Sequence, residues 1–270
     1  MAHQIHPTAV IGPLVKLLGD RVVVGPYAVV DGEVVLSDNV EVGAHAHVSG
    51  WTSVGKGTRI FPHAAIGGDP QDKKHKRTDE TYLAIGENNI FREFVTVNRG
   101  TIEGGGLTRI GNNNLFMAYA HVAHDCRVGD DCVFANSGTL AGHVVVEDRV
   151  IIGGLTAIHQ FCRLGTMAMI GGCSRVIQDV PPYALCVGGP ALVYNINAVG
   201  LRRAGMTASN MKHLKEAFRI LFHSGLAKSS AIEHILKDVV KTPEVGHLVD
   251  FAGASQRGLC GSAKEPSVEE

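Results

Sequence analysis

The sequence has few aromatic residues and no long apolar run. Aromatic residues make up 6% of the 270 residues, and no apolar run reaches the ~18 residues that a membrane-spanning helix requires. The first residues, Met1 to Gln4, do not have the composition of a signal peptide. We therefore expect a cytoplasmic protein with no stable insertion into a membrane.

An excess of one charge is also missing, and so is any closely spaced pair of cysteines. The 25 Lys+Arg residues balance 26 Asp+Glu residues, which argues against binding to nucleic acid through bulk charge. None of the six cysteines lies in a C-x-x-C pair, so a thiolate zinc site is disfavoured. Cys126, Cys132 and Cys162 are interpreted as core residues of a protein in a reducing compartment. No cofactor and no resident metal is predicted.

The chain is instead rich in glycine, with 33 residues, and carries a bulky apolar residue at every sixth position of its central part. The residues in this register are Ile110, Phe116, Val122, Val128, Phe134, Leu140, Val146, Ile152, Ile158, Leu164, Ile170 and Val176. A period of six matches neither a helix nor an isolated strand. It is typical of a parallel β-helix built from hexapeptides, in which about three hexapeptides form one triangular coil.

The same repeat occurs earlier in the chain, in shifted registers from Ile5, Val24 and Ile85. It stops at two polar segments, near residues 67–84 and 98–109, which we interpret as inserted loops. Long insertions in a repeat are often functional, although solvated bulges would give the same pattern.

The predicted domains follow from where the period changes. The β-helix is expected to cover residues 1–190, because Pro181 and Pro182 cannot donate the hydrogen bonds of a strand. Residues 191–258 show helical stripes, with Thr207 and Thr242 as helix caps, and form a C-terminal α-helical domain. Residues 259–270 are expected to be a disordered tail.

Histidines cluster within the long repeat. If one coil takes about eighteen residues, Gly142 stacks on His124, and Gln160 lies one coil further on. His143 and His159 are sequence neighbours of these two positions, so the group should gather on one side of the prism. Such a group could contain a general base, a zinc site or hydrogen-bonded surface histidines, and the spacing alone leaves all three open.

Several motifs carry a resemblance to a known family. They are IHPTAV, PQDKK, REFVTVNRGT, GGGLT, AHVAHDC, LAGHV, IIGG, HQF, GGCS, QDVPPY and GLRRAG. Over residues 3–258 the chain resembles the UDP-N-acetylglucosamine O-acyltransferases, hexapeptide-repeat enzymes that begin lipid A synthesis. The resemblance implies a left-handed coil and a homotrimer with active sites between neighbouring subunits. It also implies transfer of a 3-hydroxyacyl group from acyl carrier protein to the 3-hydroxyl of UDP-N-acetylglucosamine.

The same resemblance implies the roles of individual residues. His124 would be the general base, Asp125 its orienting partner, and the Gly142 amide the oxyanion donor. Since consecutive strand side chains point to opposite faces, His124 and Asp125 must meet at a bend. Gly172 would limit the acyl chain, and a glycine there predicts a long chain. The implied substrate-binding residues are Asp72, Lys74, His121, His143, His159, Gln160, Asn197 and Arg203.

Some positions depart from the family, and other functions remain possible. Asn98 stands where some members have histidine. Val199 and Ala204 stand where some members have glutamate and arginine, respectively. These departures affect the expected contacts with the nucleotide. The basic residues Arg202, Arg203, Lys212, Lys215 and Arg219 either dock the acidic carrier or form a solvated face. The alternatives are N-acylation of a 3-amino sugar nucleotide, a zinc-dependent β-helix carbonic anhydrase and a non-catalytic scaffold.

Overall fold

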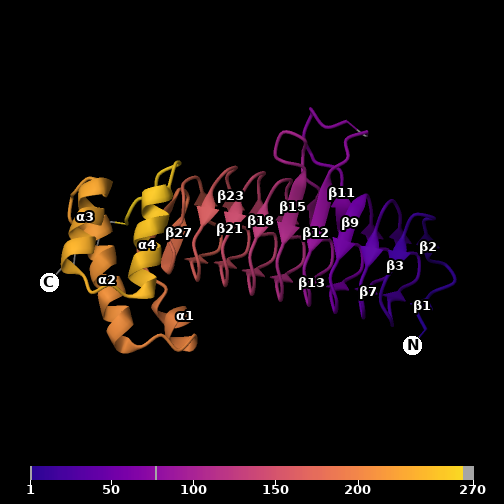
Figure 1. Cartoon of the computed structure of the whole chain (residues 1–270), viewed down its shortest axis with the longest axis horizontal. Helices are drawn as coiled ribbons and strands as arrows, with labels where there is room; N and C mark the ends of the chain where they lie inside the picture. Colours follow the sequence, from indigo (N-terminus) through magenta and orange to yellow (C-terminus); the bar gives the residue numbers. More distant parts are fainter. Residues whose placement is uncertain (1, 77, 264–270) are drawn as a thin grey trace.

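The computed structural model describes residues 2–76 and 78–263. The repeat forms a long prism of three sheets, and the helices cover its C-terminal end (Figure 1). Each coil contributes one short strand to each sheet. We name the sheets A, B and C in the order in which a coil enters them, and we name each corner by the two sheets that it joins.

The strands are short and pair in a regular order. Sheet A contains β1 (Gln4–Ile5), β4 (Val23–Val24), β7 (Glu41–Val42), β10 (Arg59–Ile60), β13 (Ile90–Phe91), β16 (Leu115–Phe116), β19 (Val133–Phe134), β22 (Ile151–Ile152), β25 (Met169–Ile170), β27 (Ala184–Gly188) and β28 (Ala191–Ile196). Sheet B contains β2 (Val10–Ile11), β5 (Val29–Val30), β8 (His47–Val48), β11 (Ala65–Gly68), β14 (Thr96–Asn98), β17 (His121–Val122), β20 (Thr139–Leu140), β23 (Ala157–Ile158) and β26 (Arg175–Val176). Sheet C contains β3 (Lys16–Leu17), β6 (Val35–Leu36), β9 (Trp51–Val54), β12 (Tyr82–Ile85), β15 (Leu107–Ile110), β18 (Arg127–Val128), β21 (Val145–Val146) and β24 (Arg163–Leu164).

The apolar residue of each hexapeptide fills the interior of the prism. Parallel pairing joins Leu115 to Val133 and Val133 to Ile151, so the coil repeat is eighteen residues. Phe91, Phe116 and Phe134 are fully buried and stack, with ring centroids 4.8 and 4.5 Å apart. Each such ring pair adds about 0.5–1.5 kcal/mol beyond the area it buries. The small residue of each hexapeptide is buried too, and burial raises the pKa of the Cys126, Cys132 and Cys162 thiols to about 12.

A left-handed backbone conformation turns the chain at the corners. Asp125, His143 and Phe161 have φ values of 60°, 61° and 66°, and all three lie at the B–C corner. Positive φ is uncommon outside glycine, yet here it recurs once in most hexapeptides. This conformation breaks the in-and-out alternation of a strand, so a corner can bring sequence neighbours together on one side.

Both inserted segments leave the prism at the same corner. Residues 69–81 connect β11 to β12, and residues 99–106 connect β14 to β15, each passing from sheet B to sheet C. Figure 1 shows a loop rising above the prism next to β11. Because His124 also lies between a strand of sheet B and one of sheet C, both insertions project from its side of the prism.

Four helices follow the last coil: α1 (Ala198–Arg203), α2 (Ala208–His223), α3 (Lys228–Asp238) and α4 (Pro243–Ala254). Thr207 and Thr242 cap α2 and α4 through their side-chain oxygens. In the described part of the chain, no helix is long and apolar enough to span a bilayer.

Two details differ from the expected domain limits. β28 pairs antiparallel with β27, so strand structure continues past residue 190. Part of the expected disordered tail is ordered, because Val193 N–H donates to the Gly261 carbonyl at 2.7 Å and Cys260 N–H to the Asp179 carbonyl at 2.8 Å. The first bond satisfies a backbone group of β28, and the second satisfies the carbonyl of Asp179, ahead of β27. Residues 264–270 of the expected tail lie outside the described residues.

Candidate active site

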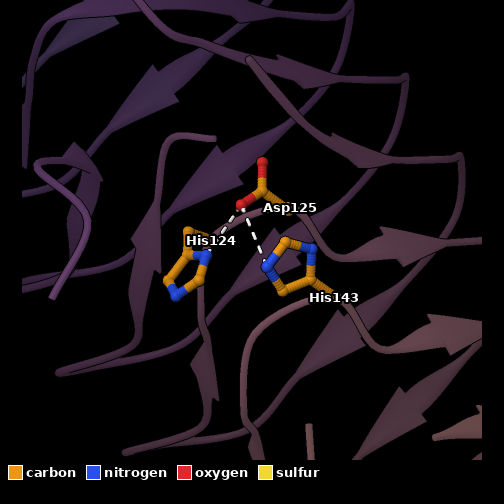
Figure 2. A group of neighbouring side chains, drawn as sticks. All are labelled: His124, Asp125 and His143. Carbon is orange, nitrogen blue, oxygen red and sulfur yellow. Dashed lines mark hydrogen bonds and ion pairs between the residues drawn. The ribbon is translucent and has the colours of Figure 1, made fainter. Parts of the chain in front are cut away.

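His124 and Asp125 meet at the B–C corner, although they are adjacent in sequence. The Nδ1 atom of His124 lies 2.7 Å from Oδ2 of Asp125 (Figure 2). Asp125 can reach it because its positive φ turns its side chain to the same side of the chain. The Asp125 side chain is 1% exposed and that of His124 is 12% exposed. A buried carboxylate on Nδ1 fixes the orientation of the imidazole and leaves Nε2 free to exchange a proton.

The second insertion holds the Asp125 carboxylate in place. Thr101 donates to it twice, from N–H to Oδ1 at 2.9 Å and from Oγ1 to Oδ2 at 2.7 Å. The Asp125 N–H donates to Oγ1 of Thr108 at 2.8 Å, and a methyl group on Gly104 would collide with the carboxylate. The sequence analysis missed Thr101 because the insertion carries no periodic signal, and it also missed Thr108, which lies on β15.

Gly142 lies directly next to the His124 imidazole, one coil further along the prism. A methyl group on Gly142 would lie 2.8 Å from Nε2 of His124. The neighbouring backbone confirms the stacking, since His143 N–H donates to the His124 carbonyl at 3.0 Å. Among the residues described, none accepts a hydrogen bond from the Gly142 N–H. A free amide beside a proton-accepting imidazole can bind an oxyanion.

His143 faces the same pair from the next coil. Its Nε2 is 3.6 Å from Oδ2 of Asp125 (Figure 2), and its ring stacks on Phe161 with centroids 4.6 Å apart. Burial lowers the pKa of His143, and the charges of Asp125 and Asp72 partly oppose this effect. Asp72, in the first insertion, is thus one of the charges that act on His143. In the insertion itself, Lys74 N–H donates to the Asp72 carboxylate at 2.9 Å.

His121 and His159 lie on either side of this group. His121 Nδ1 is 2.7 Å from Thr96 Oγ1, and burial followed by the nearby charge of His124 lowers the His121 pKa. His121 therefore acts as a neutral hydrogen-bonding group at neutral pH. His159 is exposed, with Nδ1 3.1 Å from the Gln160 carbonyl and 3.3 Å from Nη2 of Arg257. The contact with Arg257 joins residues too distant in sequence for periodicity to predict.

Three of the predicted site residues lie elsewhere on this chain. Gly172 is at the A–B corner and stacks on Gly154. Asn197 caps α1 at the C–A corner, where its Nδ2 donates to the Met167 carbonyl at 3.0 Å. Arg203, in the last turn of α1, is exposed. All three border sheet A, whereas His124 lies between sheets B and C.

The central group also has ligand atoms that metals prefer. One nitrogen of His124, one of His143 and one oxygen of Asp125 lie within 4.8 Å of one another, and zinc binds such nitrogen and oxygen ligands. However, Oδ2 of Asp125 already accepts from Thr101 and contacts His124. An ion would have to displace those contacts, so the arrangement fits a general-base pair better than a metal centre.

Comparison with known proteins decides the family. Residues 179–260 match the second domain of the Udp N-acetylglucosamine O-acyltransferase model, and residues 107–142 match the bacterial transferase hexapeptide model of six repeats. An acyl-[acyl-carrier-protein]--UDP-N-acetylglucosamine O-acyltransferase of Alkalilimnicola ehrlichii is 51% identical over 95% of this chain and 98% of its own length. The chain belongs to the UDP-N-acetylglucosamine O-acyltransferase family.

Solved structures of the family agree with the fold. LpxA from Acinetobacter baumannii superposes with a TM-score of 0.92 at 40% identity, covering 95% of this chain and 99% of that one. The Francisella novicida UDP-N-acetylglucosamine acyltransferase gives a TM-score of 0.92 at 36% identity, with 97% and 95% covered. These matches confirm the predicted left-handed parallel β-helix with a C-terminal helical domain. Membership of this O-acyltransferase family favours neither the zinc-dependent nor the N-acylating alternative.

Proposed function

We propose that this enzyme transfers a 3-hydroxyacyl chain from acyl carrier protein to the 3-hydroxyl of UDP-N-acetylglucosamine, the first step of lipid A biosynthesis. The names of its relatives specify the donor and the acceptor. The observation that carries the proposal for this chain is the contact of His124 with Asp125 on one side and with the Gly142 backbone on the other. From these two substrates we infer a reaction in the cytoplasm.

The mechanism needs only these three groups. Nε2 of His124 takes the proton from the sugar 3-hydroxyl as its oxygen attacks the thioester carbonyl. Asp125 keeps the proton on Nδ1 in place and stabilises the imidazolium that forms. The Gly142 N–H donates to the oxyanion of the tetrahedral intermediate. When the intermediate collapses, the carbon–sulfur bond breaks and His124 returns the proton to the thiolate of the carrier.

The remaining residues of the corner are proposed to bind the substrates. Lys74 can face a phosphate or a sugar oxygen from the first insertion, and Asp72 extends from the same turn. His121 and His143 are held neutral by burial, so each can both donate and accept a hydrogen bond. His159 and Gln160 continue this polar surface along the prism.

A homotrimer is supported by an apolar strip on the outside of sheet A. One residue of each strand from β13 to β27 faces outwards, and these residues pair in a single row. They are Ile90, Leu115, Val133, Ile151, Met169 and Leu185. A contact between unlike surfaces of neighbouring copies closes a ring. It would bring Gly172, Asn197 and Arg203 of one copy to the His124 corner of the next.

The docking of the carrier protein is supported by a hollow of about 380 Å³ on the helical domain. Met206 and Met211 supply its apolar lining, and Arg202, Lys212 and Lys215 supply positive charge. An acidic carrier with a flexible acyl-bearing arm matches this combination. The proposal therefore places the carrier at the start of α2.

The test is acyl transfer by His124→Ala. We expect the rate to fall by about 10²–10⁴-fold, the range for loss of a general base, while the mass of the assembly stays that of the wild type. His3→Ala, at an exposed position in the first coil, is the matched control and should keep full activity. A wild-type rate for His124→Ala would refute the mechanism. Comparing UDP-N-acetylglucosamine with its 3-amino analogue as acceptor tests the N-acylation alternative.

A further inference from the structure

A hydrogen-bonded chain of three side chains joins the helical domain to the last coils of the prism. The Tyr183 hydroxyl lies 3.1 Å from Nδ1 of His247, and Nε2 of His247 lies 3.0 Å from Oε2 of Glu147. His247 belongs to α4, Glu147 follows β21, and Tyr183 lies at the C–A corner before β27. Thr166 fixes Glu147 further, donating to the same oxygen from N–H at 2.8 Å and from Oγ1 at 3.0 Å.

The backbone of Tyr183 holds the start of α1. Its carbonyl accepts a hydrogen bond of 2.6 Å from the Asn197 N–H, and its own N–H donates to the Thr166 carbonyl at 2.7 Å. Both polar atoms of the Asn197 side chain are hydrogen-bonded in the same corner, since Nδ2 donates to Met167 and Oδ1 accepts from Gly200. Asn197 therefore orients α1, and the orientation of α1 sets the position of the exposed Arg203 at its other end.

Charged groups from both sides face His247. From the prism, the hydrogen bond and the charge of Glu147 raise the pKa of His247, and from α4 itself the charge of Asp250 also raises it. Burial and the charge of Arg163, on the prism, oppose this rise. Glu244 of α4 and Glu147 contribute to the raised pKa of the Tyr183 hydroxyl, about 12, although burial is its main cause. Hydrogen bonds to His247 and Thr166 lower the pKa of Glu147 against the effect of burial.

We propose that Glu147, His247 and Tyr183 are positioning residues that set the placement of α1, and that a proton on His247 strengthens this placement and with it the binding of the sugar nucleotide. The inference rests on the proposed function and its assembly, which would bring Arg203 of one copy to the His124 corner of the next, where it would contact the nucleotide. His247 itself does not touch the reacting atoms, because it lies on α4 and its partners belong to the C–A side of the prism.

The direction of the pH effect follows from the ion pair. Since the folded state raises the pKa of His247, the contribution of the pair is complete below the ordinary value of about 6.5 and is lost as pH rises through the folded value. Affinity for UDP-N-acetylglucosamine should therefore weaken above neutral pH.

The experiment measures UDP-N-acetylglucosamine binding by calorimetry and its KM, from about pH 6.5, the ordinary histidine value, upwards to about pH 8.5. His247→Gln keeps hydrogen-bonding atoms but has no charge. We expect its Kd and KM for the sugar nucleotide to rise about five- to tenfold at pH 6.5, the size of the net contribution of one hydrogen bond. Its kcat and its KM for the acyl donor should change less than about twofold, and its Kd should no longer depend on pH in this range.

A matched control separates this role from a structural one. His234→Gln removes an exposed ion pair of similar geometry on α3, with 3.0 Å between His234 and Asp238, and should leave all of these values unchanged. If His247→Gln bound the nucleotide as tightly as the wild type at every pH, or lowered kcat and the melting temperature alone, the positioning role would be refuted with the acyltransferase assignment intact. Absence of nucleotide binding in the wild type would overturn the proposed function and this inference together.

Discussion

The His124 imidazole rests against the bare backbone of Gly142. A methyl group on Gly142 would lie 2.5 Å from Cε1 of His124 and 2.8 Å from its Nε2, which is far inside van der Waals contact. Glycine at this position therefore does two things at once: it leaves room for the imidazole ring, and it keeps its N–H close to the atom that, in the proposed mechanism, accepts the proton. The eighteen-residue coil places these two residues together.

Gly142→Ala should lower kcat by about 100-fold, because the methyl group displaces the imidazole and the oxyanion donor together. Gly142 does not need a left-handed backbone, so the fold should survive. The measurement is steady-state acyl transfer with a melting curve for each protein. Gly253→Ala is the control: no atom lies within 4 Å of the new methyl group on α4, so kcat should be unchanged. Full activity in Gly142→Ala would contradict the proposed geometry.

The apolar strip of sheet A predicts how the assembly can be broken. Ile151 is 36% exposed at the centre of this strip, paired with Val133 and Met169. Ile151→Glu would bury a carboxylate in the proposed interface, which is costly without a partner. We expect monomers by light scattering, and loss of acyl transfer because the site would lose the neighbouring copy.

A glutamate on a different sheet tests whether the loss of assembly is specific to the outer face of sheet A. Val145 lies on the outside of sheet C between Arg127 and Arg163, where a carboxylate gains two opposite charges. Val145→Glu should therefore keep both the mass of the assembly and its activity. A trimeric, active Ile151→Glu protein would show that sheet A is not the interface.

Burial of His121 predicts a loss of stability in mild acid. Its pKa is lowered in the folded state by burial and by His124, so the unfolded chain binds the proton more readily. Stability is then complete above the ordinary histidine value of about 6.5 and falls as pH drops through it towards the folded value. In His121→Asn the fall in melting temperature between about pH 7.5 and 5.5 should be smaller than in the wild type. His6→Asn, at an exposed position, should retain the wild-type slope, and equal slopes in all three proteins would refute the prediction.

The prism itself could be predicted from the sequence because its signal is periodic. A bulky residue at every sixth position determines which side chains are buried, and the same arithmetic placed Gly142 next to His124. The contact between His124 and Asp125 depends on the positive φ of Asp125. The period of six implies a turn in each hexapeptide, but it does not show which residue adopts a positive φ. The same eighteen-residue repeat predicts that Phe161 stacks on His143, a contact that the sequence analysis does not include.

Contacts made by non-repeating segments could not be predicted. Thr101 reaches Asp125 from an insertion, and Arg257 reaches His159 from the end of the helical domain. Neither segment has a fixed spacing relative to the coils, so their positions depend on tertiary packing. The placement of Arg203 on the border of sheet A, distant from His124, likewise follows from where α1 docks.

Gly172 provides a test of how acyl chain length is selected. It lies at the A–B corner, where a side chain would start 3.2 Å from the Gly154 carbonyl, and its φ is acceptable for any residue. A longer side chain at this position would therefore extend outside the prism, into the space between neighbouring copies of the proposed trimer, the groove in which we expect the acyl chain to bind. Gly172→Met should shift the preferred donor to shorter acyl chains, lowering the ratio of kcat/KM for long over short donors by about tenfold or more, since each buried methylene contributes about 0.8 kcal/mol.

The donors for this test are acyl carrier thioesters of several lengths, each assayed with UDP-N-acetylglucosamine. Leu155→Met, at the same corner one coil earlier, keeps the side-chain volume and should leave the profile unchanged. Because the substitution acts on the groove and not on His124, transfer of the shortest donors should keep its wild-type kcat. An unchanged donor profile in Gly172→Met would refute the length-limiting role, whereas a uniform loss with all donors would indicate that the groove passes elsewhere.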